Sequence, residues 1–200
     1  GTHRVLANTN VKMLDLDDND NIVTDRTLAY NYSIAEGNST FYFVLRDNIG
    51  FYTAKDGELV DTGEKVGAED VIFTYNRLRT PDSVPGHQVY DNYACISDVA
   101  SVTDLSELEN AVDAVSGKSV KEVLEEGLPA PIAELVSDKN STDNANGKYE
   151  VVKLTTSTPF PQILNFLCDY CAGITSKKQL EAVNTAELLA DYDPTTDLRY

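Results

Sequence analysis

The sequence is poor in the residues that most catalytic sites need. It has no tryptophan, one methionine, three cysteines and two histidines, His3 and His87. General acid–base or nucleophilic catalysis needs a convergent set of groups, such as a serine beside a histidine or two carboxylates in a pocket. His3 lies near the start of the chain, so only His87 could act as an imidazole base. No Gly-x-Ser-x-Gly motif is present. The composition therefore predicts that the protein is not an enzyme, with no catalytic residue and no cofactor.

Basic residues are also scarce. Lysine and arginine number 16 against 33 aspartates and glutamates, which gives a formal net charge of -17. Such a chain repels phosphate backbones and anionic membrane surfaces, because both bind through basic patches. No apolar run approaches the roughly 18 residues that a membrane-spanning helix requires. Nucleic acid and a directly inserted membrane segment are therefore not expected as partners, and the 42% hydrophobic content suffices for a globular core.

The three cysteines do not predict a disulfide scaffold or a metal site. Cys168 and Cys171 have Cys-x-x-Cys spacing, but a zinc site would need two further ligands. We interpret the two thiols as small apolar groups on one helix face. The redox state of these residues and of Cys95 is left open.

Residues 15–26 resemble a calcium-binding loop without completing it. The first, third, fifth and seventh positions of such a loop are occupied by Asp15, Asp17, Asn19 and Asn21. However, Asp20 stands where the loop needs glycine, and Arg26 stands where it needs a bidentate glutamate. We therefore predict an acidic hairpin turn and no metal site, with weak adventitious calcium binding as the alternative.

Hydrophobic periodicity predicts a mixture of strands and helices. Strands are expected near 28–35, 40–46, 95–104 and 149–157. Helices are expected over 68–79, 104–117, 119–127, 130–138 and 159–174. Residues 47–67 are predicted as a long surface loop with a short strand pair around 56–57, and residues 139–148 as a mobile polar loop. Since helices and strands do not alternate regularly, the fold class is α+β, a mainly antiparallel sheet with packed helices.

The helix at 68–79 has the clearest signals. Gly67 is placed at its N-cap and Asp70 at the third helical position, where a carboxylate accepts hydrogen bonds from free amides. Apolar residues recur at helical spacing at Val71, Ile72, Tyr75 and Leu78. Pro81 prevents continuation of the helix.

Tyrosine is the one abundant aromatic residue, with eleven copies. Tyr90 and Tyr93 follow the helix on a segment that is predicted to be irregular. An aromatic ring with a polar tip can line a binding groove and hydrogen-bond to the backbone of a ligand. The alternative is that both rings close the edge of the core, and the sequence does not choose between the two.

Two stretches together resemble a known family. "LRDNIGF" (45–51) followed by "GEKVGAEDVIFTYNRLRTPDS" (63–83) is similar to the signature region of the family 5 extracellular solute-binding proteins of ABC transporters, which include oligopeptide, dipeptide and nickel binders. The matching positions are Leu45, Arg46, Asp47, Phe51, Gly63, Ala68, Asp70, Val71, Tyr75, Arg77 and Leu78. The sequence departs from the family at Tyr32 in place of tryptophan, at Asn48 in place of glycine, and by extra residues before Gly63.

The resemblance implies a fold and a domain organisation. Residues 1–200 are expected to form a single domain, a subdomain of the N-terminal lobe of a larger periplasmic-binding-protein-like protein of the class II, peptide-binding type. Residues 104–148 are expected to be a helical insertion and loop that is atypical of the family. Asp70, Arg77 and Arg46 are assigned to folding, as a helix cap and as ion-pairing groups.

The resemblance also implies a function. The full-length protein is expected to be the substrate-binding component of an ABC importer, which binds peptides or a similar solute in a cleft between two lobes and delivers it to the permease. It is expected outside the cytoplasm, at the cell surface or in the periplasm, held by a lipid anchor. The chain alone is not expected to bind ligand. The cleft candidates are Tyr90, Tyr93, Asp169 and Tyr170. The alternative function is an extracellular protein-interaction or adhesion module with an acidic face.

Overall fold

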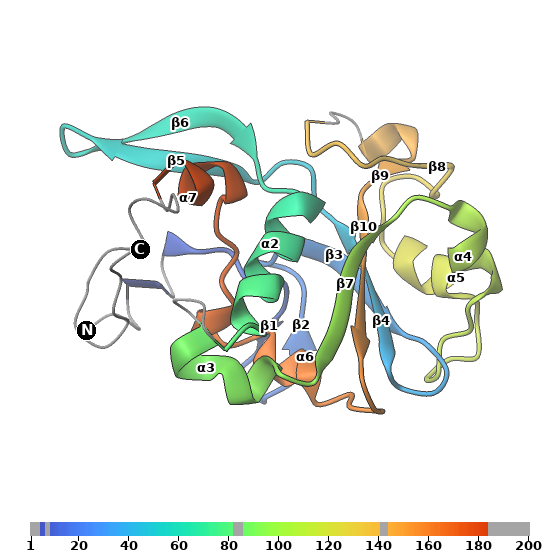
Figure 1. The fold of residues 1–200 in the computed structure, drawn as a ribbon. Helices are drawn as coiled ribbons and strands as arrows, with labels where there is room; N and C mark the ends of the chain where they lie inside the picture. Colours follow the sequence, from blue (N-terminus) through green and yellow to red (C-terminus); the bar gives the residue numbers. More distant parts are fainter. Residues whose placement is uncertain (1–4, 7–8, 82–85, 141–143, 184–200) are drawn as a thin grey trace.

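The computed structural model describes residues 5–6, 9–81, 86–140 and 144–183. Its centre is an antiparallel sheet of four strands in the order β3-β4-β10-β7 (Figure 1). These strands are β3 (Ala29–Ile34), β4 (Thr40–Leu45), β7 (Ile96–Val102) and β10 (Val151–Thr156). All four predicted strands are confirmed, and so is the α+β class with a mainly antiparallel sheet.

Strand β4 lies inside the sheet and is buried on both faces. Phe41, Phe43 and Leu45 point into one hydrophobic cluster, whereas Tyr42 and Val44 point into a second cluster on the other side. None of the five side chains is more than 5% exposed. Successive side chains of a strand face opposite ways, so a continuous apolar run needs a packed layer on each face of the sheet.

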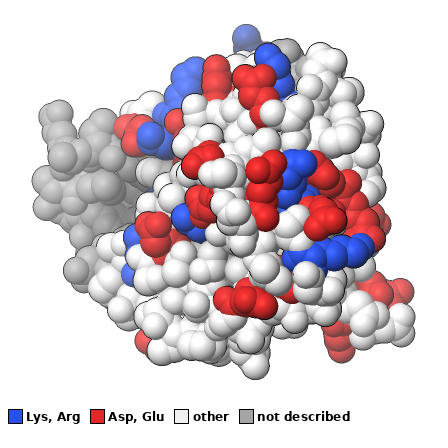
Figure 2. Space-filling view, turned by 90° about the vertical axis from the view of Figure 1, so that its right-hand side faces the viewer, with Lys and Arg blue, Asp and Glu red and all other residues white. Residues whose placement is uncertain are grey.

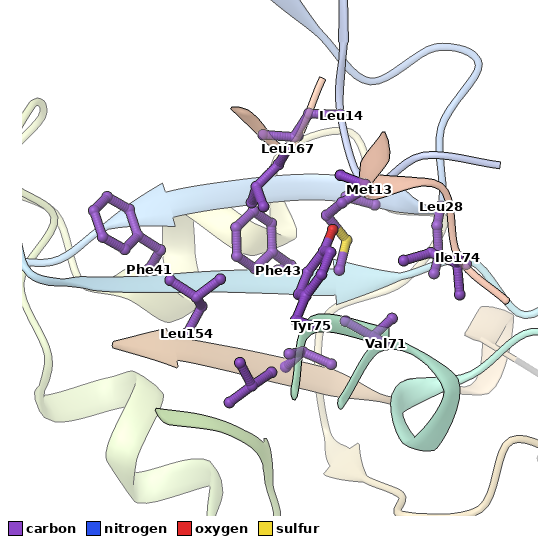
Figure 3. Close-up of a cluster of buried hydrophobic side chains, with 14 of the residues drawn as sticks. Met13, Leu14, Leu28, Phe41, Phe43, Val71, Tyr75, Leu154, Leu167 and Ile174 are labelled. Atoms are coloured by element: carbon purple, nitrogen blue, oxygen red, sulfur yellow. The ribbon is translucent and has the colours of Figure 1, made fainter. Parts of the chain in front are cut away.

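The larger cluster fills the first face of the sheet, beneath α2 (Ala68–Leu78), α3 (Gly86–Tyr93) and α6 (Ile163–Phe166). Figure 3 shows Phe43 of the sheet beside Tyr75 of α2, in the same cluster as Val71. Within the described ranges, no helix has the length and apolar character needed to cross a bilayer.

Helix α2 begins as the sequence predicts. The Gly67 amide donates to the Asp70 carboxylate at 3.0 Å, and the same carboxylate accepts the Lys177 amide at 2.9 Å. Asp70 is fully buried. Its side chain therefore caps α2 and also ties it to the start of α7 (Lys177–Val183).

Gly67 is required by close packing and not by its backbone conformation, which is extended. A Cβ atom at this position would collide with the Lys139 side chain and would lie 2.7 Å from Glu150 Oε2. We expect Gly67→Ala to lower the free energy of unfolding by about 1–3 kcal/mol, measured in urea. Gly50→Ala is the control, because its nearest non-neighbour atom would be 3.6 Å away. Equal effects of the two variants would contradict this packing.

The predicted acidic hairpin is present at residues 15–23. Strands β1 (Asp15–Leu16) and β2 (Ile22–Val23) pair antiparallel. The Asp17 carboxylate between them accepts the amides of Asn19 at 2.8 Å and Asn21 at 2.9 Å. The Asp17 carboxylate thus holds the turn, as expected for an acidic hairpin.

The second face of the sheet is covered by α4 (Leu105–Asn110) and α5 (Val120–Glu125). The smaller hydrophobic cluster here includes Val44, Val102, Leu108, Val120 and Leu124. Polar contacts add to it, because the Asn31 side-chain amide donates to the Val123 carbonyl at 2.8 Å. Residues 105–125 therefore form a layer against the sheet (Figure 1).

Helix α4 is shorter than predicted. The pattern favours a helix over 104–117, but α4 ends at Asn110. The Asp113 carboxylate then accepts the Ser116 amide at 2.7 Å and the Ser33 hydroxyl at 2.8 Å. These bonds close a turn against β3, so the tertiary contacts outweigh the local helical pattern.

The helix predicted at 130–138 is wrong. The Ile132 amide donates to the Glu125 carboxylate at 2.7 Å, and the Glu134 amide donates to the Gly147 carbonyl at 2.8 Å. The chain is extended here, and β8 (Glu134–Leu135) pairs parallel with β9 (Lys148–Tyr149). Backbone hydrogen bonds to a distant segment override the weak helical preference.

The helix predicted over 159–174 is also shortened. Only α6 is α-helical there, and a 3-10 turn, η2 (Tyr170–Ala172), follows it. The Asp169 carboxylate accepts the Cys171 amide at 2.9 Å and so starts a separate turn.

Residues 50–65 form a long hairpin where a surface loop with only a short strand pair is predicted. Strands β5 (Gly50–Lys55) and β6 (Glu58–Lys65) are joined at Asp56 and Gly57, whose φ angles are 52° and 85°. Two positive φ angles are the signature of a tight hairpin turn, and Asp-Gly is a favoured pair for it. The local turn signal was correct, but the extent of the strands was underestimated.

Asn144, within the stretch predicted as a mobile loop, makes tertiary hydrogen bonds. Asn144 is buried, its side-chain amide donates to the Leu45 carbonyl at 3.1 Å, and its backbone amide donates to the Asp47 carboxylate at 3.1 Å. It begins the 3-10 turn η1 (Asn144–Asn146). Residues 141–143 of the predicted loop lie outside the described residues.

Candidate functional site

Helix α3 carries two of the predicted cleft residues. Tyr90 and Tyr93 are helical, so the prediction of an irregular segment is wrong. Tyr93 is fully buried, and its hydroxyl donates to the Phe166 carbonyl at 2.9 Å. Its ring meets the Phe166 ring edge-on at a centroid distance of 6.3 Å. Burial raises the pKa of Tyr93 far above its ordinary value. Tyr93 therefore fixes α3 against α6, and Tyr90 lies half-buried one turn earlier.

Removing the Tyr93 hydroxyl tests this packing role. Tyr93→Phe leaves the ring in place but leaves the Phe166 carbonyl without this hydrogen bond. We expect the free energy of unfolding to fall by about 1 kcal/mol. Tyr52→Phe is the matched control, because Tyr52 is 57% exposed on the β5–β6 hairpin. A loss no larger than that of the control would show that the hydroxyl contributes nothing to folding.

Asp169 and Tyr170 lie beside Tyr93, at the turn after α6. Asp169 is exposed and Tyr170 is partly exposed. A hydrogen bond with the Cys171 side chain raises the pKa of Tyr170 to about 12, so its hydroxyl stays protonated at neutral pH. The Phe166 carbonyl accepts both the Tyr93 hydroxyl, at 2.9 Å, and the Asp169 amide, at 3.1 Å, so Tyr93 lies next to the turn that contains Asp169 and Tyr170. The structure thus gathers Tyr93, Asp169 and Tyr170 at one corner of the first face.

The thiols near this corner are protonated at neutral pH. Cys168 is buried, its thiol donates to the Leu164 carbonyl at 3.2 Å, and burial raises its pKa to about 11. Burial also raises the pKa of Cys171 and of Cys95. All three cysteines are free. A reactive or metal-binding cysteine needs its thiolate, so this environment suits neither role.

The described ranges give no assembled centre for a metal. Among these residues, no three or more histidine, cysteine, aspartate or glutamate side chains lie so that they could hold a metal ion. The side chains of the only two histidines, His3 and His87, fall outside the described part of the chain.

A groove runs along the outer side of α2. Its volume is about 560 Å³, and it is open to solvent. Ile72 and Phe73 supply apolar surface, while Glu69 and Lys177 supply charge. The Arg77 guanidinium lies over the Phe73 ring, 5.4 Å from its centroid. The volume of the groove falls within the range of small-ligand sites, although such sites are usually more enclosed.

Sequence reasoning did not identify this groove. The helical pattern groups Val71, Ile72, Tyr75 and Leu78. Val71, Tyr75 and Leu78 are buried, whereas Ile72 is only partly buried against the core and also lines the groove. The missed signal is Phe73, a partly buried aromatic residue that the helical pattern does not assign to the core-facing stripe. An apolar residue outside that stripe indicates a second contact surface.

Known proteins that are similar to this chain are found among solved structures. No protein-family model matches the sequence, and no curated protein matches it. Among solved structures, the periplasmic binding protein AgaA from A. tumefaciens R10, in complex with agropinic acid, is similar with a TM-score of 0.54. It is 16% identical, and the similarity covers 92% of this chain and 25% of AgaA.

Two peptide-binding proteins are similar as well. The pheromone receptor PrgZ has a TM-score of 0.53 at 13% identity, with 92% of this chain and 28% of PrgZ covered. Haemophilus influenzae OppA, in complex with the peptide RPPGFSPFR, has a TM-score of 0.50 at 12% identity, with the same two coverages.

The sequence motifs in residues 45–83 resemble family 5 solute-binding proteins, and these matches confirm that resemblance at the level of the fold. The match extends over nearly all of this chain, and the chain spans only about a quarter of the length of each structure. The chain therefore has the fold of one part of a periplasmic solute-binding protein of the peptide-binding type.

Proposed function

We propose that this chain is part of a longer solute-binding protein, the substrate-binding component of an ABC importer. The longer protein takes a peptide or a similar small solute into a cleft between two lobes and delivers it to a permease. The strongest support comes from two solved structures, one with bound agropinic acid and one with a bound peptide. Nearly the whole of this chain matches about a quarter of the length of each of these proteins. On this proposal the protein does no chemistry.

The proposed location is outside the cytoplasm. A similar structure, at 14% identity and a TM-score of 0.50, is described as a periplasmic murein tripeptide-binding protein. We propose that the full-length protein lies in the periplasm or at the cell surface and is held there by a lipid anchor.

We propose that the corner formed by α3 and η2 borders the cleft. Asp169 and Tyr170 are the exposed groups of this corner and offer a carboxylate and a phenol to a ligand. Tyr90 is half-buried on the same helix as Tyr93, and Tyr93 supports the corner from inside. An aromatic ring with a polar tip suits the backbone of a bound peptide.

A second candidate function is a protein-interaction module. Figure 2 shows the face over α4 and α5, where red acidic side chains are numerous and blue lysines and arginines lie among them. On this view residues 104–148, which we propose to be an insertion atypical of the family, contact another extracellular protein. The mixed charges equally suit a solvated surface.

The solute carried by the full-length protein tests the proposal. We expect that denaturing the protein as purified from its own cells releases a peptide or other small solute, identified by mass spectrometry. The emptied and refolded protein then rebinds that solute in a calorimeter. Release of no solute, together with tight binding of an extracellular protein to residues 104–148, would favour the second function.

Binding by the refolded protein also tests the corner. Tyr170→Ala is expected to weaken solute binding about tenfold, which corresponds to about 1.4 kcal/mol. The matched control is Tyr52→Ala, because Tyr52 is an exposed tyrosine on the β5–β6 hairpin. Equal affinity of both variants would remove Tyr170 from the cleft.

A further inference from the structure

A buried charge cluster lies at the N-terminus of α2. The side chain of Lys139 is 8% exposed, and its ammonium group contacts Glu64 of β6, Glu69 at 3.0 Å and Asp70 at 3.6 Å. One buried cation thus serves three carboxylates from two elements. The segment before η1 is held to α2 and β6 through this lysine.

Glu150 lies beside this cluster, between β9 and β10. It is 8% exposed, and its Oε2 atom accepts the Ala68 amide at 3.2 Å. Its Oε1 atom is buried without a hydrogen-bond partner among the described residues. A buried carboxylate with an unsatisfied oxygen is costly, whereas a protonated acid needs only an acceptor for its proton.

Among the residues that the structure describes, no cation is paired with Glu150. The charged side chains that face it or its immediate neighbours come from β6, α2, the end of β4 and the segment before η1. They are Glu64, Glu69, Asp70, Arg46, Asp47, Asp138 and Lys139. Lys139 is already shared by three carboxylates. Two further lysines pair with other carboxylates. The Lys177 ammonium lies 3.8 Å from Glu69 Oε2, and the Lys178 ammonium lies 3.9 Å from Glu64 Oε2.

Arg46 is also engaged elsewhere. Its guanidinium donates to the Thr24 carbonyl at 2.8 Å and to the Thr27 carbonyl at 3.1 Å, and it lies 4.0 Å from the centroid of the Tyr30 ring. Burial, followed by the charges of Asp70, Asp138 and Glu69, raises the pKa of Glu150 to about 7, although the Ala68 amide opposes this rise.

A small cavity adjoins Glu150. Its volume is about 10 Å³, and its polar lining is Arg46, Asp47, Asp138, Lys139, Asn144 and Glu150. A volume of roughly 10–15 Å³ is what a single water molecule needs, together with two to four polar partners. The cavity is too small for an organic ligand. The described side chains also contain no cluster of three or more acidic, histidine or cysteine groups that could hold a metal ion.

We propose that this place is a combined proton and water site, in which Glu150 is protonated and donates from Oε1 to one water molecule in the cavity. The water in turn donates to the carboxylates of Asp47 or Asp138. Glu150 thereby joins the N-terminus of α2 to the segment before η1, and the site does not depend on solute binding.

The site predicts a defined dependence of stability on pH. The pKa of Glu150 is higher in the folded chain than the ordinary value of 4.5, so folding favours the protonated form. Stability is therefore full at low pH and falls as pH rises from about 4.5 through about 7. We expect the unfolding equilibrium constant to rise roughly 70-fold between about pH 5 and about pH 8 from this group alone.

Glu150→Gln tests the pH dependence, because the amide can still donate to the water but cannot titrate. We expect this variant to fold and to lose the rise in the unfolding constant between about pH 5 and pH 8. Glu122→Gln is the control. Hydrogen bonds from Ser119 lower the pKa of Glu122 below 4.5, so its contribution is lost only below that pH. The control should therefore keep the wild-type profile at higher pH.

A carboxyl carbon-13 NMR titration of the unmodified chain gives a second test that needs no variant. We expect the Glu150 carboxyl to titrate near pH 7, and a high-resolution experimental structure to place one water within hydrogen-bonding distance of Oε1. A Glu150 midpoint below about pH 5, with identical profiles for wild type and Glu150→Gln, would overturn the proposal. A metal ion in the cavity, or a protein donor on Oε1, would also overturn it.

Discussion

Replacing Leu124 by alanine is expected to lower the free energy of unfolding by about 2–5 kcal/mol, because the change leaves a cavity in a packed core. Leu124 is fully buried in α5 and belongs to the cluster on the second face of the sheet. The side chain of Tyr42 connects the same layers, since its hydroxyl donates to Glu107 of α4 at 2.9 Å. Urea unfolding followed by circular dichroism measures the effect.

The control for this variant comes from the same stretch of chain. Val115 is 83% exposed, so Val115→Ala is expected to change the free energy of unfolding by less than about 0.5 kcal/mol. If Leu124→Ala is as mild as its control, the layer of α4 and α5 does not pack on the sheet, and the two-faced architecture is wrong.

Replacing Asp70 by alanine is the second large expected effect, about 3 kcal/mol of lost stability. The change removes the acceptor for the amides of Gly67 and Lys177, both of which lose a partner at a buried junction. It also takes one of three carboxylates from Lys139. Burial raises the pKa of Asp70, whereas the two amides and then Lys139 oppose this rise and favour the ionised form.

Glu69→Ala is the matched control for Asp70→Ala. The Glu69 carboxylate is also near Lys139, at 3.0 Å, but its side chain is 47% exposed. A partly exposed ion pair contributes about 0–1 kcal/mol, so the loss should be much smaller. Equal losses of stability in thermal unfolding would contradict this expectation. They would mean that the hydrogen bonds from Gly67 and Lys177 to Asp70 contribute nothing beyond the charge of its carboxylate.

Local signals in the sequence predicted the elements that depend on local physics. The run "FYFVL" predicted a strand, and it became a strand buried on both faces. Gly67 and Asp70 predicted the start of α2, because the amides at a helix start need an acceptor wherever the helix lies. The turn at Asp56 and Gly57 was also recognisable from its residue types.

The failures came where distant groups decide the backbone. Residues 130–138 carry a helical pattern, but their amides bond to Glu125 and Gly147. The helix predicted from 104 stops where Asp113 meets Ser33 of β3. No pattern within a single segment contains these partners.

The candidate site was predictable in part. The sequence singles out Tyr93 as an aromatic residue with a polar tip, but it does not contain the contact of the Tyr93 hydroxyl with the Phe166 carbonyl. The sequence does not single out Glu150, because it is one of 33 acidic residues. Its properties come from burial and from the neighbouring Asp70 and Asp138.

A calorimetric titration with a mixed peptide library shows whether this chain forms only one side of a ligand cleft, as we propose. It is performed on the two hundred residues alone and on the full-length protein. We expect saturable heat from the full-length protein and none from the shorter chain. Saturable binding of micromolar affinity by the two hundred residues alone would contradict it.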